Sequence, residues 1–109
     1  MSLSPEQIAL LRDAAKYGGW KLLDLPWHEQ FGFGIDLPGD GTDTWNPLID
    51  HGDLYDLMAA GKVIPAYDYS YMWKTEGGNV FKCECTDDFT SQAWAVITVC
   101  AMAQRRKGK

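Results

Sequence analysis

The sequence predicts an α+β fold with the element order α-β-β-α-β-β-α, in which three helices pack on one four-stranded, mostly antiparallel sheet as a layered sandwich. Apolar residues recur at helical spacing near both ends and in the middle of the chain, and two pairs of segments between them have strand-like patterns. Clusters of Gly, Pro and Asp separate the segments. With 109 residues, 46% of them hydrophobic, the chain has the length and composition of one globular domain.

We expect this single domain to span residues 1–109, with residues 1–3 outside the fold and the basic residues 105–109 as a fraying end. The first helix begins after Ser4, a favourable N-cap, because Pro5 suits the first helical position and Gln7 can close a capping box. Two consecutive glycines, Gly18 and Gly19, end it.

A hairpin is predicted next. Residues 20–25 form a short strand that ends before Pro26, and residues 27–30 form its turn. In residues 31–37 four apolar residues alternate with two glycines and an aspartate, which predicts a second strand. Glycines on one face indicate that another part of the chain packs very close there, or that the strand bends. Residues 38–41 have the composition of a loop.

The central helix is predicted from an N-cap at or near Asp50 to Gly61, with Leu54, Leu57 and Met58 as its apolar stripe. A second hairpin follows, with strands at about 63–74 and 80–86 and a turn at 76–79.

The two strands of this hairpin have distinct faces. Four aromatic residues share one face of the first strand, and we expect them to pack under the last helix, while a stacking platform for nucleic-acid bases is the alternative. These residues are Tyr67, Tyr69, Tyr71 and Trp73. On the second strand Phe81, Cys83 and Cys85 share a face.

The last helix is predicted to run to about Gln104 after a cap at Asp87, Asp88 or Thr90. It is apolar on most of its circumference, so it is either largely buried or paired with another chain.

Negative charge is concentrated in one stretch of the chain. The formal net charge is −5, and between Asp24 and Gly61 there are eight acidic residues and no Lys or Arg. Such a surface repels phosphate backbones, so nucleic-acid binding is disfavoured, and it complements a basic protein surface.

The cysteines and the hydropathy of the chain indicate where in the cell the protein is located. The three cysteines are an odd number, and Cys83 and Cys85 are too close in sequence to pair well, so we expect reduced thiols and neither a metal site nor a cofactor. No apolar run is long enough to span a membrane and no signal peptide is recognisable, so we expect a cytoplasmic protein without a membrane segment.

Residues 45–57 read W-N-P-L-I-D-H-G-D-L-Y-D-L. This segment resembles the W-N-P-L-x-D-x-G-D-A-x-x-L segment of small tailed-phage and prophage proteins without an assigned activity, including those described as phage αβα-sandwich domains. The resemblance implies a phage or prophage origin, a bacterial host cell and a three-layer fold in which the motif opens the central helix. It implies no catalytic residues. Leu54 stands where a small residue is usual in that segment.

The motif also has a direct physical interpretation as a helix entry. Asn46 before Pro47 favours an extended or turn conformation, and carboxylates at Asp50 and Asp53 are favourable at a helix N-terminus. Gly52 leaves room for another backbone to approach. The residues with structural roles in this interpretation are Trp45, Asn46, Pro47, Leu48, Asp50, Gly52 and Asp53.

Three functional hypotheses follow. The first is an acidic protein–protein interaction module that binds a host or phage protein. The second is a small hydrolase-like or metal-dependent enzyme, with His51 as a general base beside Asp50 and Asp53; known catalytic motifs are missing, so we expect no catalytic residues. The third is a structural homo-oligomer, such as a homodimer, formed through the last helix or an edge strand. The candidate binding surface consists of Asp40, Asp43, Asp50, His51, Asp53 and Asp56.

Overall fold

The computed structural model describes residues 3–39 and 41–107. In this part of the chain the elements are α1 (Pro5–Gly18), β1 (Lys21–Leu22), β2 (Phe33–Asp36), β3 (Thr42–Trp45), α2 (His51–Gly61), β4 (Ile64–Pro65), β5 (Tyr71–Glu76), β6 (Asn79–Glu84) and α3 (Phe89–Lys107). The α+β class and the three predicted helices are confirmed. The element order is α-β-β-β-α-β-β-β-α, with one more strand on each side of α2 than predicted.

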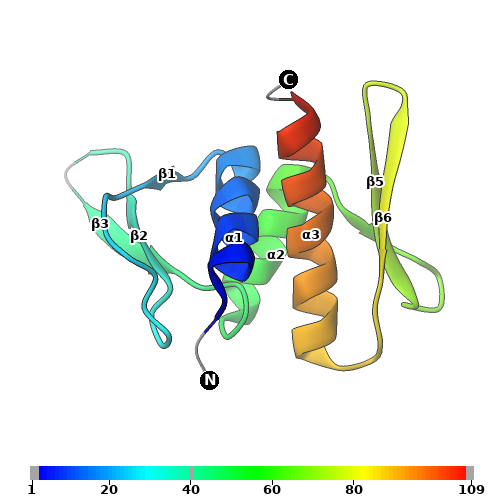
Figure 1. The fold of residues 1–109 in the computed structure, drawn as a ribbon, viewed down its shortest axis with the longest axis horizontal. Helices are drawn as coiled ribbons and strands as arrows, with labels where there is room; N and C mark the ends of the chain where they lie inside the picture. Colours follow the sequence, from blue (N-terminus) through cyan, green and yellow to red (C-terminus); the bar gives the residue numbers. More distant parts are fainter. Residues whose placement is uncertain (1–2, 40, 108–109) are drawn as a thin grey trace.

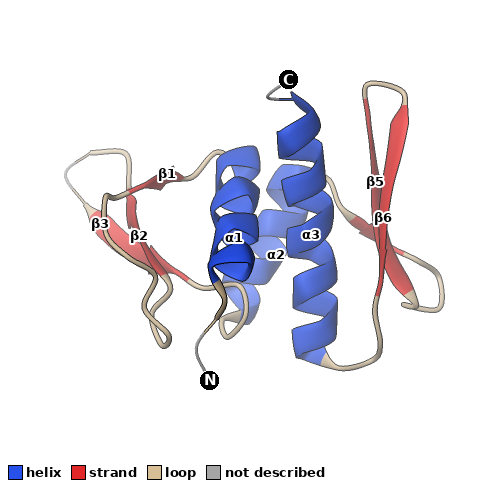
Figure 2. Cartoon of the chain, viewed as in Figure 1, coloured by secondary structure: helices blue, strands red, loops and turns tan. Residues whose placement is uncertain are grey.

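The strands form two separate antiparallel sheets, β1-β2-β3 and β4-β5-β6, so the prediction of one four-stranded sheet is wrong. Figure 1 shows the three helices between these sheets, with the first sheet beside α1 and the second beside α3. Figure 2, in which helices are blue and strands red, shows the helices as the middle layer and the two sheets as the outer layers. This layering is the reverse of an αβα sandwich.

The helices separate the two sheets, because the second sheet packs against α3 and the first sheet contacts α1. The buried residues of α3 include Val96, Ile97 and Cys100, and α3 packs against α1 as well as against β5 and β6. Phe33 lies in one sheet and Phe81 in the other, whereas Tyr69 lies in the turn before β5. A common sheet for these three residues, which the predicted architecture required, is therefore not formed.

The strands that the sequence misplaced are short or polar. β3 lies directly after the predicted loop at 38–41 and has three exposed residues before the buried Trp45. β1 and β4 have two residues each. An edge strand with an exposed face needs no apolar alternation, so its pattern does not distinguish it from a loop.

The face of β5 that packs on α3 is the one opposite to the prediction. Met72 and Lys74 are 2% and 3% exposed, whereas Tyr71 and Trp73 lie on the other face and are half-buried. Alternation alone leaves both faces possible; α3 covers the side of Met72, where the aliphatic stem of Lys74 also packs. The predicted burial of the four aromatic residues on one strand face is wrong: Tyr67 and Tyr69 lie outside β5, and Tyr71 and Trp73 lie on its half-buried face.

Sequence signals for helix caps and turns predicted the structure correctly. Ser4 and Gln7 form the predicted capping box, and both residues of the β5–β6 turn, Gly77 and Gly78, have positive φ. Asp88 accepts a hydrogen bond from the Ser91 N–H at 3.3 Å, as expected of a cap for α3. α3 extends through Lys107, beyond its predicted end. Within the described residues, no helix combines the length and the apolar character needed to cross a membrane.

Candidate functional site at the start of the central helix

Trp45 anchors the segment that leads into α2. Its side chain is completely buried, and its ring lies 5.2 Å from that of Trp20. Gly32 passes directly over its backbone: a Cβ at Gly32 would overlap the carbonyl oxygen of Trp45 and lie 2.7 Å from the Cβ of Asn46. The expected close packing at a glycine of this strand region is confirmed.

Asn46 connects three parts of the chain. Its side-chain Nδ2 donates to the carbonyl of Gln30 at 3.2 Å, and its Oδ1 accepts from the Leu48 N–H at 3.1 Å. Its backbone N–H donates to Asp53 Oδ2 at 2.9 Å. Asn46 is only 4% exposed, so these bonds satisfy polar groups that would otherwise be costly to bury.

Asp50 is the N-cap of α2, as predicted. Its extended backbone precedes the helix, and its Oδ1 accepts from the Asp53 N–H at 3.0 Å. Gly52 does not have its predicted role. A Cβ there would meet only the Asp50 Oδ1, at 3.1 Å, because Gly52 lies exposed in the first turn of the helix.

Three of the predicted surface residues, Asp43, Asp50 and Asp56, lie near enough to Asp53 for their charges to act on it. Burial raises the pKa of Asp53, the Asn46 N–H lowers it, and the negative charges of Asp50, Asp56 and Asp43 raise it again. We call Asp43, Asp50, Asp53 and Asp56 the acidic face. Asp40 lies outside the described residues.

Cations do not neutralise the acidic face in this structure. The ion pairs found in residues 3–39 and 41–107 are Lys21–Asp36, Lys74–Glu76 and Arg105–Asp13. A small hollow of about 170 Å³ lies beside the start of α2 and is lined by Leu3, Trp27, Glu29, Asn46, Leu48 and Ile49. Ile49 is 59% exposed, so the acidic face borders apolar surface that is open to solvent.

The ring of His51 packs against aromatic residues. This ring lies 4.0 Å from that of Phe89 and 6.5 Å from that of Tyr55. Among the residues that the structure describes, no hydrogen bond joins His51 to Asp50, and no three His, Cys, Asp or Glu side chains are grouped closely enough to hold a metal ion. Of the three residues of the enzyme hypothesis, Asp50 accepts from the Asp53 N–H and Asp53 accepts from the Asn46 N–H, whereas His51 packs against Phe89.

Replacing Asp56 with asparagine should lower the pKa of Asp53, since this change removes one of the charges that raise it. The raised pKa means that stability contributed by Asp53 is complete below the unfolded value of 3.8 and is lost as the pH rises through the folded value. Asp56→Asn should reduce that loss. Carboxyl ¹³C NMR across a pH series measures the change, and Asp24→Asn, which removes a charge that does not act on Asp53, should leave the titration unchanged.

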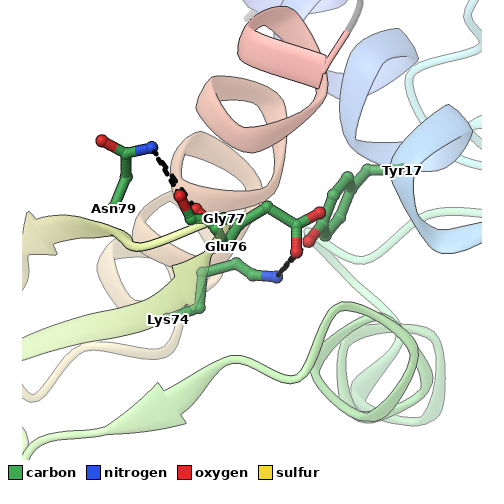
Figure 3. A network of polar contacts seen from close by, with 5 residues as sticks. All are labelled: Tyr17, Lys74, Glu76, Gly77 and Asn79. Atoms are coloured by element: carbon green, nitrogen blue, oxygen red, sulfur yellow. Dashed lines mark hydrogen bonds and ion pairs between the residues drawn. The ribbon is translucent and has the colours of Figure 1, made fainter.

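Sequence reasoning missed a buried charged residue, Lys74. Its Nζ donates to the Tyr17 hydroxyl and lies 3.8 Å from Glu76 Oε2. Figure 3 shows the three side chains converging between α1 and β5. Burial, followed by the hydrogen bond and charge of Glu76, raises the pKa of Tyr17 to about 12. A lysine at an alternating strand position normally indicates the solvent face, and no sequence signal marked this one as buried.

A hollow lined by three lysines lies beside Lys74. α1, α2 and α3 all end here, around a hollow of about 380 Å³ lined by Tyr17, Ala60, Gly61, Lys62, Lys74, Thr75, Glu76 and Lys107. Helix C-termini carry partial negative charge, which nearby lysines offset. Lys62, Lys74 and Lys107 line this hollow, where their positive charges are favourable beside the helix ends.

The fold and the acidic face define a class: a small α+β domain with an uncompensated acidic surface next to exposed apolar residues. Comparison with protein-family models, curated proteins and solved structures gives no match to this chain.

Proposed function

We propose that the protein is an acidic protein–protein interaction module that binds a basic host or phage protein through the acidic face. The observation on which this proposal rests is that the charges of Asp43, Asp50 and Asp56 act on Asp53, while no ion pair within the described residues involves any of these four carboxylates. Like charges repel one another, and lysine or arginine residues of a partner would relieve that repulsion.

Apolar contact would add to this attraction. The hollow beside α2 and the exposed Ile49 lie next to the carboxylates. Protein interfaces combine a small apolar centre with a polar rim, and complementary charge accelerates association. A partner with a basic surface that surrounds an apolar side chain fits both features.

The proposed setting is a phage or prophage protein that acts in the cytoplasm of the bacterial host. Its support is the resemblance of residues 45–57 to the phage segment. The contacts of Asp50, Asp53 and His51 weigh against the enzyme alternative, because Asp50 caps α2, Asp53 holds the Asn46 N–H and the His51 ring packs on Phe89. Homo-oligomerisation through α3 has little support, since most of its apolar residues are buried within the monomer.

The test uses a photo-cross-linking amino acid at position 49, in a bacterial host that produces the protein. A discrete basic protein should be cross-linked, and the double variant Asp43→Asn/Asp56→Asn should lose most of that product. Raising the salt concentration should also reduce it, because the screening length falls from about 10 Å at 0.1 M to about 3 Å at 1 M.

The matched control is Glu6→Gln/Glu84→Gln, which removes the same charge from exposed positions outside the acidic face. It should retain the cross-linked product. Equal loss in both double variants would mean that only net charge matters, and a product insensitive to either variant and to salt would refute the proposal.

A further inference from the structure

A further cavity, of about 240 Å³, lies between α2, the turn before β5 and the first turn of α3. Apart from Gln92, its walls are apolar or aromatic, and they include Leu54, Tyr55, Met58, Tyr69 and Phe89. Sites for whole small-molecule ligands usually have about 300–1,000 Å³. The size and apolar walls of this cavity instead suit one large side chain.

The rim of the cavity exposes aromatic rings to solvent. Tyr55 is 63% exposed and Tyr69 is 54% exposed. Phe89 is covered on one side by the ring of His51. Aromatic rings around an enclosed apolar space are typical of interface centres, where they provide a large contact area.

Tyr69 has an unfavourable backbone conformation. Its φ of 58° lies in the left-handed region, which bulky residues rarely adopt. Hydrogen bonds hold it there: its N–H donates to the Ala66 carbonyl at 3.0 Å, and its own carbonyl accepts from Cys85 Sγ at 3.4 Å. Glycine would adopt this φ without strain, so the aromatic ring at the cavity is present despite a backbone cost, a feature that is common at binding sites.

Two exposed aspartates are adjacent in sequence to residues that line the cavity. Asp68 precedes Tyr69 and Asp88 precedes Phe89, and both aspartates are exposed. Neither takes part in an ion pair within the described residues, and the cavity lining contains no Lys or Arg. The charge that complements this rim is positive.

We propose that this cavity receives one large apolar side chain from a partner protein segment, with lysine or arginine residues on either side of that side chain facing Asp68 and Asp88. This inference rests on the proposed function and adds to it: the acidic face attracts a basic partner, and the cavity under Tyr69 anchors the partner segment.

Short lysine-rich peptides with a central Phe, Leu or Ala are the probes. In methyl NMR, the Phe and Leu peptides should shift the Met58 signal saturably, and the Ala peptide should not. Tyr69→Gly should weaken binding by a factor on the order of five, because it removes one aromatic contact. Its melting temperature should be unchanged or higher, since glycine suits the φ of this position. Tyr67→Ala is the control, because Tyr67 is fully exposed and does not line the cavity.

The possible failures are distinguishable. Equal binding of the Ala and Phe peptides, or unchanged binding to Tyr69→Gly, would overturn this inference. Shifts confined to residues around Ile49 would also overturn it, while leaving the acidic face as a binding surface. Conversely, if the Phe peptide shifts Met58 but cross-linking at position 49 captures no basic protein, the cavity binds its probe and the proposed use of the acidic face is wrong.

Discussion

Replacing Gly32 with alanine should destabilise the protein by about 3–4 kcal/mol, because two costs combine at this position. The φ of Gly32 is 78°, which is unfavourable for any residue with a Cβ. The added Cβ would also overlap the Trp45 carbonyl oxygen, and backbone atoms cannot move aside as a flexible side chain can. Small domains have total stabilities of about 5–15 kcal/mol, so urea unfolding should show a large decrease in midpoint.

Gly78→Ala separates the two costs. Gly78 has a similar φ of 83°, and nothing lies within 4 Å of the position that its Cβ would take. Only the conformational cost applies there, so we expect a loss of about 1–2 kcal/mol. Equal losses in the two variants would show that the contact between Gly32 and Trp45 is unimportant.

Replacing Lys74 with alanine should cost about 3 kcal/mol, because it removes a buried cation and leaves its partners without it. Tyr17 would lose a hydrogen-bond donor and Glu76 its ion pair. Glu76 is partly exposed, so water compensates for some of the loss, and the cost should lie at the lower end of the range for buried pairs. Chemical denaturation at neutral pH measures the effect.

Lys74→Met/Glu76→Gln is the control for charge. Methionine keeps most of the aliphatic volume, and the glutamine removes the carboxylate that would otherwise lack its cation. Replacing a buried ion pair with apolar residues is often neutral, so this double variant should recover much of the stability. A double variant as unstable as Lys74→Ala would mean that the charged lysine itself is required.

Features set by adjacent residues could be predicted from the sequence. The Ser4 and Asp50 caps and the glycine turn of β5–β6 depend on local chemistry, and each was predicted at the correct place. The division into two sheets depends on which strands meet in space. Residues 42–44 gave no strand signal because they form an exposed edge, and the alternation in β5 could not show whether Met72 or Trp73 faces α3.

The candidate site was predictable to a similar extent. The sequence predicted a shared acidic surface that included Asp43, Asp50, Asp53 and Asp56, and in the structure the charges of the other three act on Asp53. The contact between Asn46 and Gln30, and the burial of Lys74, join residues that are far apart in the sequence. Neither the Asn46–Gln30 contact nor the burial of Lys74 produces a pattern in the neighbouring sequence, so only the structure shows them.

The central position of α3 has a consequence for how the chain matures during synthesis. α3 follows every other element, yet α1 packs against one side of it and the β5–β6 hairpin against another. While residues 89–107 are still inside the ribosome, the apolar sides of α1 and of this hairpin have no cover. Nascent chains that stall before Phe89 should therefore be open, protease-sensitive and dependent on chaperones, and folding should be completed only when the last helix emerges.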